Sequence, residues 1–309
     1  MLVTTKRMLQ KAKKEGYAVP HFNVSNLETV KSVIEGCSKM NSPVIVATSE
    51  SAIKYAGIKS LKSLVESLAY KSKIQIALHL DHSPSYELAK DCLKEGWTSI
   101  MRDASNLPFD KNVKETKRVV DLAHKKNIAV EAEIGRLSGK EGWVESKESL
   151  FTNPEDARKF TLLTKCDSLA VSIGTSHGAY KFKGYPRLDF NLLEEIEHKV
   201  SLPLVLHGAS SVPSFLVHKA NKYGADLRGA KGVPDSQIKK AIRIGICKIN
   251  TDTDLRIAFD ASIREFLNKE PRDFNPRDIL KATIDEMQKV VESKVKLFGS
   301  EDKSDMLRK

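Results

Sequence analysis

The sequence predicts a single (β/α)₈ barrel, because short apolar runs alternate with longer stretches of helical periodicity along most of its 309 residues. Unusual polar residues follow many of these runs, and only a closed barrel brings that many strand ends to one site. No GxGxxG turn follows the first run, which disfavours a doubly wound open sheet. The eight candidate strands are Ala18–Asn23, Val44–Thr48, Ile76–Asp81, Ser99–Asp103, Ala129–Ile134, Ser168–Gly174, Pro203–Gly208 and Ile246–Thr253.

Amphipathic helices are predicted between these strands and after the last of them. The intervening helices are Leu27–Met40, Tyr86–Glu95, Val113–Lys126 and Pro154–Thr164. After the eighth strand, Leu255–Leu267 and Ile279–Leu297 predict a C-terminal helical arm over residues 255–309 of a single 1–309 domain. The glycine-rich stretch Asn221–Asp235 is expected to be a loop over the active-site face, since loops of this length are usually functional.

Composition and charge limit the kinds of partner. Hydrophobic residues make up 40% and charged residues 29%, a normal balance for a folded domain. The net charge of +11 suits anionic substrates, whereas the scattered lysines, with no dense basic tail, argue against nucleic acid. With neither a signal peptide nor an apolar run of about 20 residues, we expect a cytoplasmic protein with no membrane contact. Four widely spaced cysteines predict reduced thiols.

Histidines recur at the ends of three predicted strands. His82 follows His79 and Asp81 at the end of the third strand, His177 follows the sixth, and His207 ends the seventh. Three histidines at one end of a barrel match the three protein ligands of a catalytic zinc ion, with an open position for substrate. His79, by contrast, is expected to be an interior, hydrogen-bonded residue.

Five segments together resemble the signature segments of the class II (metal-dependent) fructose-bisphosphate aldolases. They occur in the family's order, and the resemblance covers nearly the whole chain. The segments are His79–His82, Val130–Gly135, Gly174–Gly178, His207–Ser210 and Asn250–Asp254.

This resemblance implies a set of metal and catalytic residues. The implied ligands of a catalytic Zn²⁺ are His82, His177 and His207, and Asp103 and Glu133 form an accessory position. A second divalent metal and a monovalent cation are also compatible with the family's pattern. The implied acid and base groups are Asp81, acting on the hydroxyl at the breaking bond, and Glu141, in the glycine-rich loop Gly135–Gly142, moving the proton on the carbanion side. Glu131 is expected to support these ligands from behind.

The chemistry of aldol cleavage explains these residue types. Cleaving a β-hydroxy ketone leaves an enediolate, which needs charge stabilisation of the kind a zinc ion provides as a Lewis acid. One carboxylate accepts the hydroxyl proton and a second acid protonates the carbon afterwards. Placing Glu141 on a glycine-rich loop lets it close over the substrate.

Two phosphate positions are also indicated. In barrels the loops after strands seven and eight commonly bind phosphate, and by resemblance Gly178 joins them in a dihydroxyacetone-phosphate site. The residues in those two loops are Gly208, Ala209, Ser210, Asn250, Thr251, Asp252 and Thr253. Candidates for the second phosphate are Ser49, Arg256 and Arg277. By resemblance Arg277 reaches in from a neighbouring subunit, so a homodimer or homotetramer is expected.

Two positions depart from the family's pattern. Ser83 stands where a glycine or another very small residue is usual, and Arg102 stands where an apolar residue is usual. The side chain of Arg102 is expected to point toward the helix layer and to find a partner there.

Other functions stay open on the residues alone. Lys248, on the last strand, suits an imine-forming aldolase. A metal-dependent hydrolase would use the same histidines and carboxylates, and a basic barrel could bind nucleic acid without catalysis. Within the aldolases, the segment Asn250–Arg256 resembles the fructose-specific version more than the tagatose-specific one.

Overall fold

The barrel predicted from the sequence is present. The structure is a computed structural model that describes residues 2–136, 139–141, 144–146, 150–176 and 187–305. Eight parallel strands close into a barrel, with the last pairing back onto the first. In order around the barrel they are β1 (Val19–Asn23), β2 (Val44–Ser49), β3 (Ile76–Ser83), β4 (Ser99–Arg102), β5 (Ala129–Ile134), β8 (Ser168–Val171), β9 (Leu204–Leu206) and β10 (Ile246–Thr251).

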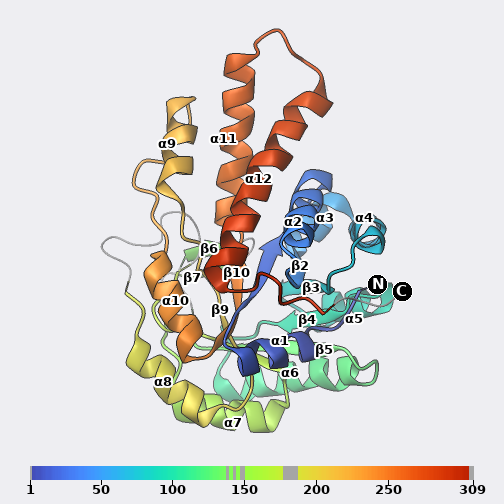
Figure 1. Cartoon of the computed structure of the whole chain (residues 1–309). Helices are drawn as coiled ribbons and strands as arrows, with labels where there is room; N and C mark the ends of the chain where they lie inside the picture. The colour runs from blue at the N-terminus through green and yellow to red at the C-terminus, as the bar shows by residue number, and fades with distance from the viewer. Residues whose placement is uncertain (1, 137–138, 142–143, 147–149, 177–186, 306–309) are drawn as a thin grey trace.

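Helices surround this barrel and extend beyond it (Figure 1). The helices are α1 (Thr5–Glu15), α2 (Leu27–Lys39), α3 (Glu50–Ala56), α4 (Ile58–Lys71), α5 (Tyr86–Glu95), α6 (Phe109–His124), α7 (Pro154–Thr164), α8 (Phe190–Lys199), α9 (Ser214–Lys222), α10 (Asp235–Ile244), α11 (Thr253–Lys269) and α12 (Pro276–Phe298). None of the described helices combines the length and the apolar character that crossing a membrane requires.

The main hydrophobic core lies between the strands and the helices. Alternate residues of each strand point outward into it, as Leu78 and Leu80 do on β3. Trp97, which is fully buried, packs in the same layer and donates its indole N–H to the hydroxyl of Thr48 at 3.0 Å. The opposite faces of the strands are therefore free to carry polar residues into the barrel.

A smaller core closes the N-terminal end of the barrel. Met8 and Leu9 of α1 pack against Val19, Ile45 and Ala77 inside it. Helix α1 was not predicted from the sequence, because its apolar residues form a narrow stripe among lysines. Because this core fills the amino-terminal end of the barrel, a binding site is expected at the carboxyl ends of the strands.

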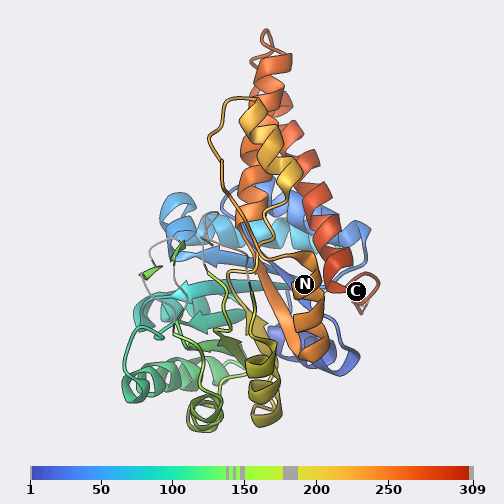
Figure 2. The same cartoon turned by 90° about the vertical axis from the view of Figure 1, so that its left-hand side faces the viewer.

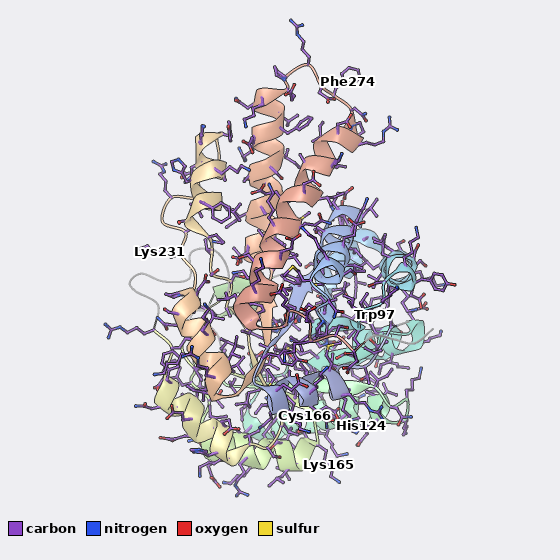
Figure 3. The ribbon with its side chains drawn as sticks, in the orientation of Figure 1. Trp97, His124, Lys165, Cys166, Lys231 and Phe274 are labelled. Atoms are coloured by element: carbon purple, nitrogen blue, oxygen red, sulfur yellow. The ribbon has the colours of Figure 1, made fainter. Side chains whose placement is uncertain are left out.

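The predicted C-terminal arm is formed by α11 and α12, with α9 alongside it (Figure 2). Phe274, between α11 and α12, is 90% exposed at the tip of the arm (Figure 3). The last turn of α12 returns to the barrel, where the carbonyl of Phe298 accepts a hydrogen bond from the backbone of Ala18 at 3.0 Å.

Several expected boundaries were wrong. The strands β8 and β9 end before the polar residues that follow them, so those residues lie in loops, whereas β10 ends at Thr251 and Thr253 already belongs to α11. The segment Gly135–Gly142 was expected to be a plain loop, but Gly139–Glu141 is strand β6, paired antiparallel with β7 (Val144–Ser146). Glycine-rich composition alone did not reveal this pairing.

All four cysteines are buried and make no disulfide, as expected. Burial raises the pKa of Cys92 and of Cys166 to about 12 and that of Cys247 to about 11, and it also raises the pKa of Cys37. Cys166 lies at the lower end of the molecule in Figure 3, far from the arm.

Because the thiolate is the reactive form, the native protein should react with an aromatic disulfide reagent at less than about a hundredth of the rate of the unfolded chain. Absorbance at the wavelength of the released thiol measures this rate. The protein in denaturant is the control and should release four equivalents, one for each cysteine. A cysteine that reacts rapidly in the native protein would contradict the burial described here.

Candidate active site

An irregularity in strand β3 points two consecutive residues into the barrel mouth. On a regular strand Asp81 and His82 would face opposite sides. The pairing of β3 with β4 shifts between Leu80 and Ser83, and His82 adopts a left-handed backbone with φ +45°. Both side chains are buried, and a ligand atom of each lies within 4.8 Å of the other and of one on His207. This local distortion therefore creates the centre of the site.

His82 and His207 come together from opposite parts of the chain. Their ring centroids are 4.6 Å apart in an edge-to-face arrangement. His207 directly follows β9, and His82 is the next-to-last residue of β3. The third predicted histidine, His177, lies outside the described residues, as does Gly178. The structure thus brings together two of the three predicted zinc ligands.

Two predicted carboxylates flank these imidazoles. The Nδ1 atom of His82 lies 2.8 Å from Asp103 Oδ2 and 3.9 Å from Glu133 Oε2, and His207 Nδ1 lies 3.2 Å from Glu133 Oε2. Burial tends to lower the pKa of His82, but Asp81, Asp103 and Glu133 outweigh it and raise that pKa well above its ordinary value. The carboxylates around the two imidazoles therefore favour a positive charge between them.

The donor set fits a metal ion. Among the residues described, the buried atoms His207 Nδ1 and Glu133 Oε2 make no hydrogen bond, although they lie 3.2 Å apart. Buried polar atoms normally have a partner, and imidazole nitrogens with carboxylate oxygens are ligands that zinc accepts. A divalent cation next to Asp81, His82 and His207 would satisfy them.

A buried ion pair supports His207 from behind. Glu131 Oε1 lies 3.0 Å from His207 Nε2, and the amine of Lys248 donates to the same oxygen at 2.9 Å. Burial tends to raise the pKa of Glu131, but Lys248 and His207 outweigh it and lower that pKa. Lys248 also donates to Asn250 Oδ1 at 2.8 Å. This amine is engaged in an ion pair, so the arrangement does not favour the imine-forming alternative.

Two asparagines hold the carboxylate of Asp81. Asn23 Nδ2 donates to one oxygen at 2.8 Å and Asn250 Nδ2 to the other at 3.3 Å. Burial tends to raise the pKa of Asp81, but His21 and His82 outweigh it and hold that pKa well below its ordinary value. Asn23 was not predicted to be a site residue, although its position at the end of the first strand was a usable signal.

His79 is an interior, hydrogen-bonded residue, as expected, and two further histidines are exposed on helices. His79 is fully buried and its Nδ1 lies 2.8 Å from the hydroxyl of Ser99. Burial, followed by the charge of Lys248, lowers the pKa of both His79 and His21. His124 and His198 are exposed on α6 and α8.

The loops after β9 and β10 lie side by side at the mouth. Gly208 has φ +59°, and a Cβ there would lie 2.6 Å from the carbonyl oxygen of Ser176, so the turn requires glycine. The hydroxyl of Ser210 accepts the backbone N–H of Asp252 at 3.4 Å. Ala209, in the loop after β9, and Thr251, at the end of β10, are both buried. The structure therefore brings the predicted loop residues, through Thr253 at the start of α11, to one edge of the mouth.

A cavity of about 380 Å³ adjoins this mouth. Its lining includes Ser49, Asn23 and Arg256, and Arg256 forms a two-bond ion pair with Asp252 at 2.9 and 2.8 Å. Arg277 is not part of this cavity, because it lies in the first turn of α12 near the tip of the arm. Glu141 lies on β6, and only its backbone is described.

The two departures from the family's pattern are accommodated. Ser83 is fully buried and its hydroxyl donates to the carbonyl of Ser85 at 3.0 Å. Arg102 donates to the backbone carbonyls of Ser83, at 3.0 Å, and of Asp103, and lies 3.8 Å from Glu115 on α6. Arg102 therefore ties β4 to the end of β3, and this pairing is the one the sequence left unassigned.

Comparison with known proteins gives a consistent assignment. Residues 3–226 and 227–303 match the family model described as fructose-bisphosphate aldolase class-II. A fructose-bisphosphate aldolase of Thermus caldophilus is 49% identical over 302 residues, covering 97% of this chain and 99% of the relative. One from Helicobacter pylori (strain ATCC 700392 / 26695) is 42% identical, covering 98% of this chain and all of the relative.

Solved structures agree with these sequence matches. The crystal structure of the YdjI aldolase from Escherichia coli K12 superposes with a TM-score of 0.81 at 30% identity, covering 99% of this chain and 100% of that one. The chain belongs to the class II fructose-bisphosphate aldolase family, a family of metal-dependent lyases.

Proposed function

We propose that this protein cleaves fructose 1,6-bisphosphate reversibly into dihydroxyacetone phosphate and glyceraldehyde 3-phosphate, with a zinc ion as cofactor. The observation that carries the proposal is the convergence of Asp81, His82 and His207, whose ligand atoms lie within 4.8 Å of one another. The whole chain would act as one barrel domain with its arm. Steady-state cleavage of the fructose and tagatose bisphosphates, with and without a chelator, tests both substrate and metal.

The zinc ion would be held by His82, His207 and, by resemblance, His177. When bound, it supplies Lewis-acid stabilisation of the negative charge that cleavage leaves on the three-carbon fragment. Asp103 and Glu133 would offer a second divalent position, since both carboxylates lie beside His82. Glu131 and Lys248 would keep the ring of His207 oriented for binding. A monovalent cation near the phosphate loops stays part of the proposal by resemblance.

Asp81 would accept the proton of the hydroxyl group at the breaking bond. Its pKa is held low and both oxygens receive asparagine hydrogen bonds, so the carboxylate is ionised and oriented. Glu141 would move the proton at the carbon of the three-carbon fragment. Glu141 lies in the hairpin β6–β7, and by resemblance this segment would close over the bound substrate.

Phosphate groups would bind on both sides of the metal position. The loop residues Gly208, Ala209 and Ser210, with Asn250–Thr253 and Gly178, would take the phosphate of the dihydroxyacetone half. Ser49 and Arg256 line the neighbouring cavity and would take the distal phosphate. Arg277 would join them from a neighbouring subunit, so we propose a homodimer or homotetramer, in the cytoplasm.

Replacing either described histidine ligand should remove the metal. His82→Ala and His207→Ala should each lose zinc and nearly all cleavage activity, since two ligands rarely hold a catalytic zinc ion. Metal analysis and circular dichroism measure zinc content and folding. His124→Ala changes an exposed histidine distant from the mouth and is the matched control. A folded His207→Ala protein with stoichiometric zinc would overturn the ligand assignment.

A proton-exchange experiment should distinguish the roles of the two proposed proton-transfer groups. Asp81→Ala should abolish cleavage but still exchange the activated proton of dihydroxyacetone phosphate with solvent, because exchange needs no hydroxyl at the breaking bond. Glu141→Ala should impair the exchange itself. Proton exchange followed by NMR in heavy water gives both rates, and equal rates in the two variants would show that the roles are misassigned.

Arg277→Ala should lower kcat/KM for the bisphosphate by roughly ten- to a hundredfold, because a charged phosphate contact contributes about 1.5–3 kcal/mol. Exchange on dihydroxyacetone phosphate, which has no distal phosphate, should be nearly intact. Mixing Arg277→Ala with Asp81→Ala subunits should restore activity at hybrid sites if the arginine acts across a subunit boundary. Unchanged bisphosphate kinetics in Arg277→Ala would remove its phosphate role.

A further inference from the structure

A buried ion pair links the arm to the mouth of the barrel. Lys294, near the end of α12, places its amine 2.7 Å from Asp254 Oδ2 in the first turn of α11. The side chains are 5% and 0% exposed. Charged pairs this deeply buried add little to stability compared with apolar residues of similar size. We therefore expect this pair to have a role other than stability.

The carboxylate of Asp254 binds the segment that follows the proposed phosphate loop. It accepts the backbone N–H groups of Ser211, at 3.2 Å, and of Val212, at 2.8 Å. Lys294 also donates to the hydroxyl of Ser211. Val212 has φ +49°, a conformation that a β-branched residue rarely adopts, so these bonds hold a backbone that would otherwise relax.

The Ser210–Val212 segment also makes close contacts on its opposite side. The carbonyl of Ser210 accepts the backbone N–H of Val233 at 3.2 Å. A Cβ on Gly232 would lie 2.2 Å from that same carbonyl oxygen, so only glycine allows this approach. Ser210–Val212 is therefore fixed between the 228–235 segment and the bases of α11 and α12.

The charge of Asp254 matters to any phosphate bound there. Its carboxylate contacts the two residues directly after Ser210, and it follows Asp252 and Thr253 in the chain. An unneutralised carboxylate at this depth would repel a phosphate dianion on the loop, because buried charges are weakly screened. Lys294 supplies the cation that cancels it.

We propose that Lys294 is a positioning residue for phosphate binding: through Asp254 it fixes the Ser210–Val212 segment and neutralises the carboxylate behind the phosphate loop. The ligand class is a phosphate monoester dianion. The base of the arm thereby sets the affinity of the barrel mouth for phosphorylated substrates. This inference rests on the proposed function, because that function places the substrate's phosphate on Gly208–Ser210.

Three variants of the zinc-loaded protein test whether the charges of Lys294 and Asp254 affect phosphate binding. They are Lys294→Met, Asp254→Asn, and the two combined. The measurements are KM and kcat for bisphosphate cleavage, the inhibition constant of glycerol 3-phosphate as a phosphate-monoester probe, and zinc content. Lys294→Met should raise KM and the inhibition constant by about tenfold or more, or about 1.4 kcal/mol, while kcat falls much less and zinc stays bound. Lys289→Met, on the same helix with a 71% exposed side chain, is the matched control and should match the unmodified protein.

The double variant distinguishes an electrostatic role of Lys294 from a purely structural one. It carries no charge at positions 254 and 294, and asparagine still accepts a backbone N–H, so it should recover most of the affinity for glycerol 3-phosphate that Lys294→Met loses. A double variant as weak as Lys294→Met, or an unchanged inhibition constant in Lys294→Met, would overturn the proposal.

The remaining comparison holds even if Lys294→Met does not fold. Asp254→Asn has one more positive charge than the double variant, so it should bind glycerol 3-phosphate several-fold more tightly, and equal inhibition constants would overturn the proposal. Failure of the unmodified protein to cleave the bisphosphate would instead refute the proposed function.

Discussion

The site depends on one electrostatic constraint: a closed barrel gathers several ionisable side chains where water cannot screen them. Asp81, Asp103, Glu131, Glu133 and Lys248 are all buried beside His82 and His207. Each of these charges is tolerable only because an opposite charge or a hydrogen-bond donor lies next to it. Lys248 against Glu131 at 2.9 Å and His82 against Asp103 at 2.8 Å are the clearest pairs. The resulting network is rigid, and rigidity is what a catalytic metal site needs.

The same constraint explains the distortion of β3. A regular strand would send either Asp81 or His82 into the apolar helix layer, where its polar atoms would lack partners. The shifted register and the left-handed backbone at His82 cost conformational energy, but they place both side chains among charged partners. The strain is thus located where two functional groups are needed on adjacent residues.

The sequence was sufficient for the barrel and for the approach of His82 to His207, because both follow from local patterns. Alternating apolar residues predicted β3 and β5, and parallel strands align their carboxyl ends, so His82 and His207 were expected to meet. The roles of α1, of the hairpin β6–β7 and of Asn23 were missed. The roles of α1 and of Asn23 depend on contacts between residues far apart in the chain: Met8 packs against Ala77, and Asn23 bonds Asp81. The partner of Arg102 was undetermined for the same reason, since a helix and two strand ends supply it.

The carboxylates on the two sides of the mouth have different charged partners. On the side formed by β3 to β5, Asp103 and Glu133 face the imidazoles of His82 and His207, an arrangement that attracts a divalent cation. On the side formed by β9 and β10, the two acidic residues beside the Gly208–Ser210 loop each pair with a basic side chain. Asp252 pairs with Arg256 at 2.8 Å, and Asp254 pairs with Lys294 at 2.7 Å. Under the proposed function, a ketose bisphosphate would need a metal at its carbonyl end and no net negative charge behind its phosphate. This division of charge would meet both needs, and it depends on α11 and α12, which the barrel itself does not need for closure, reaching back to the mouth.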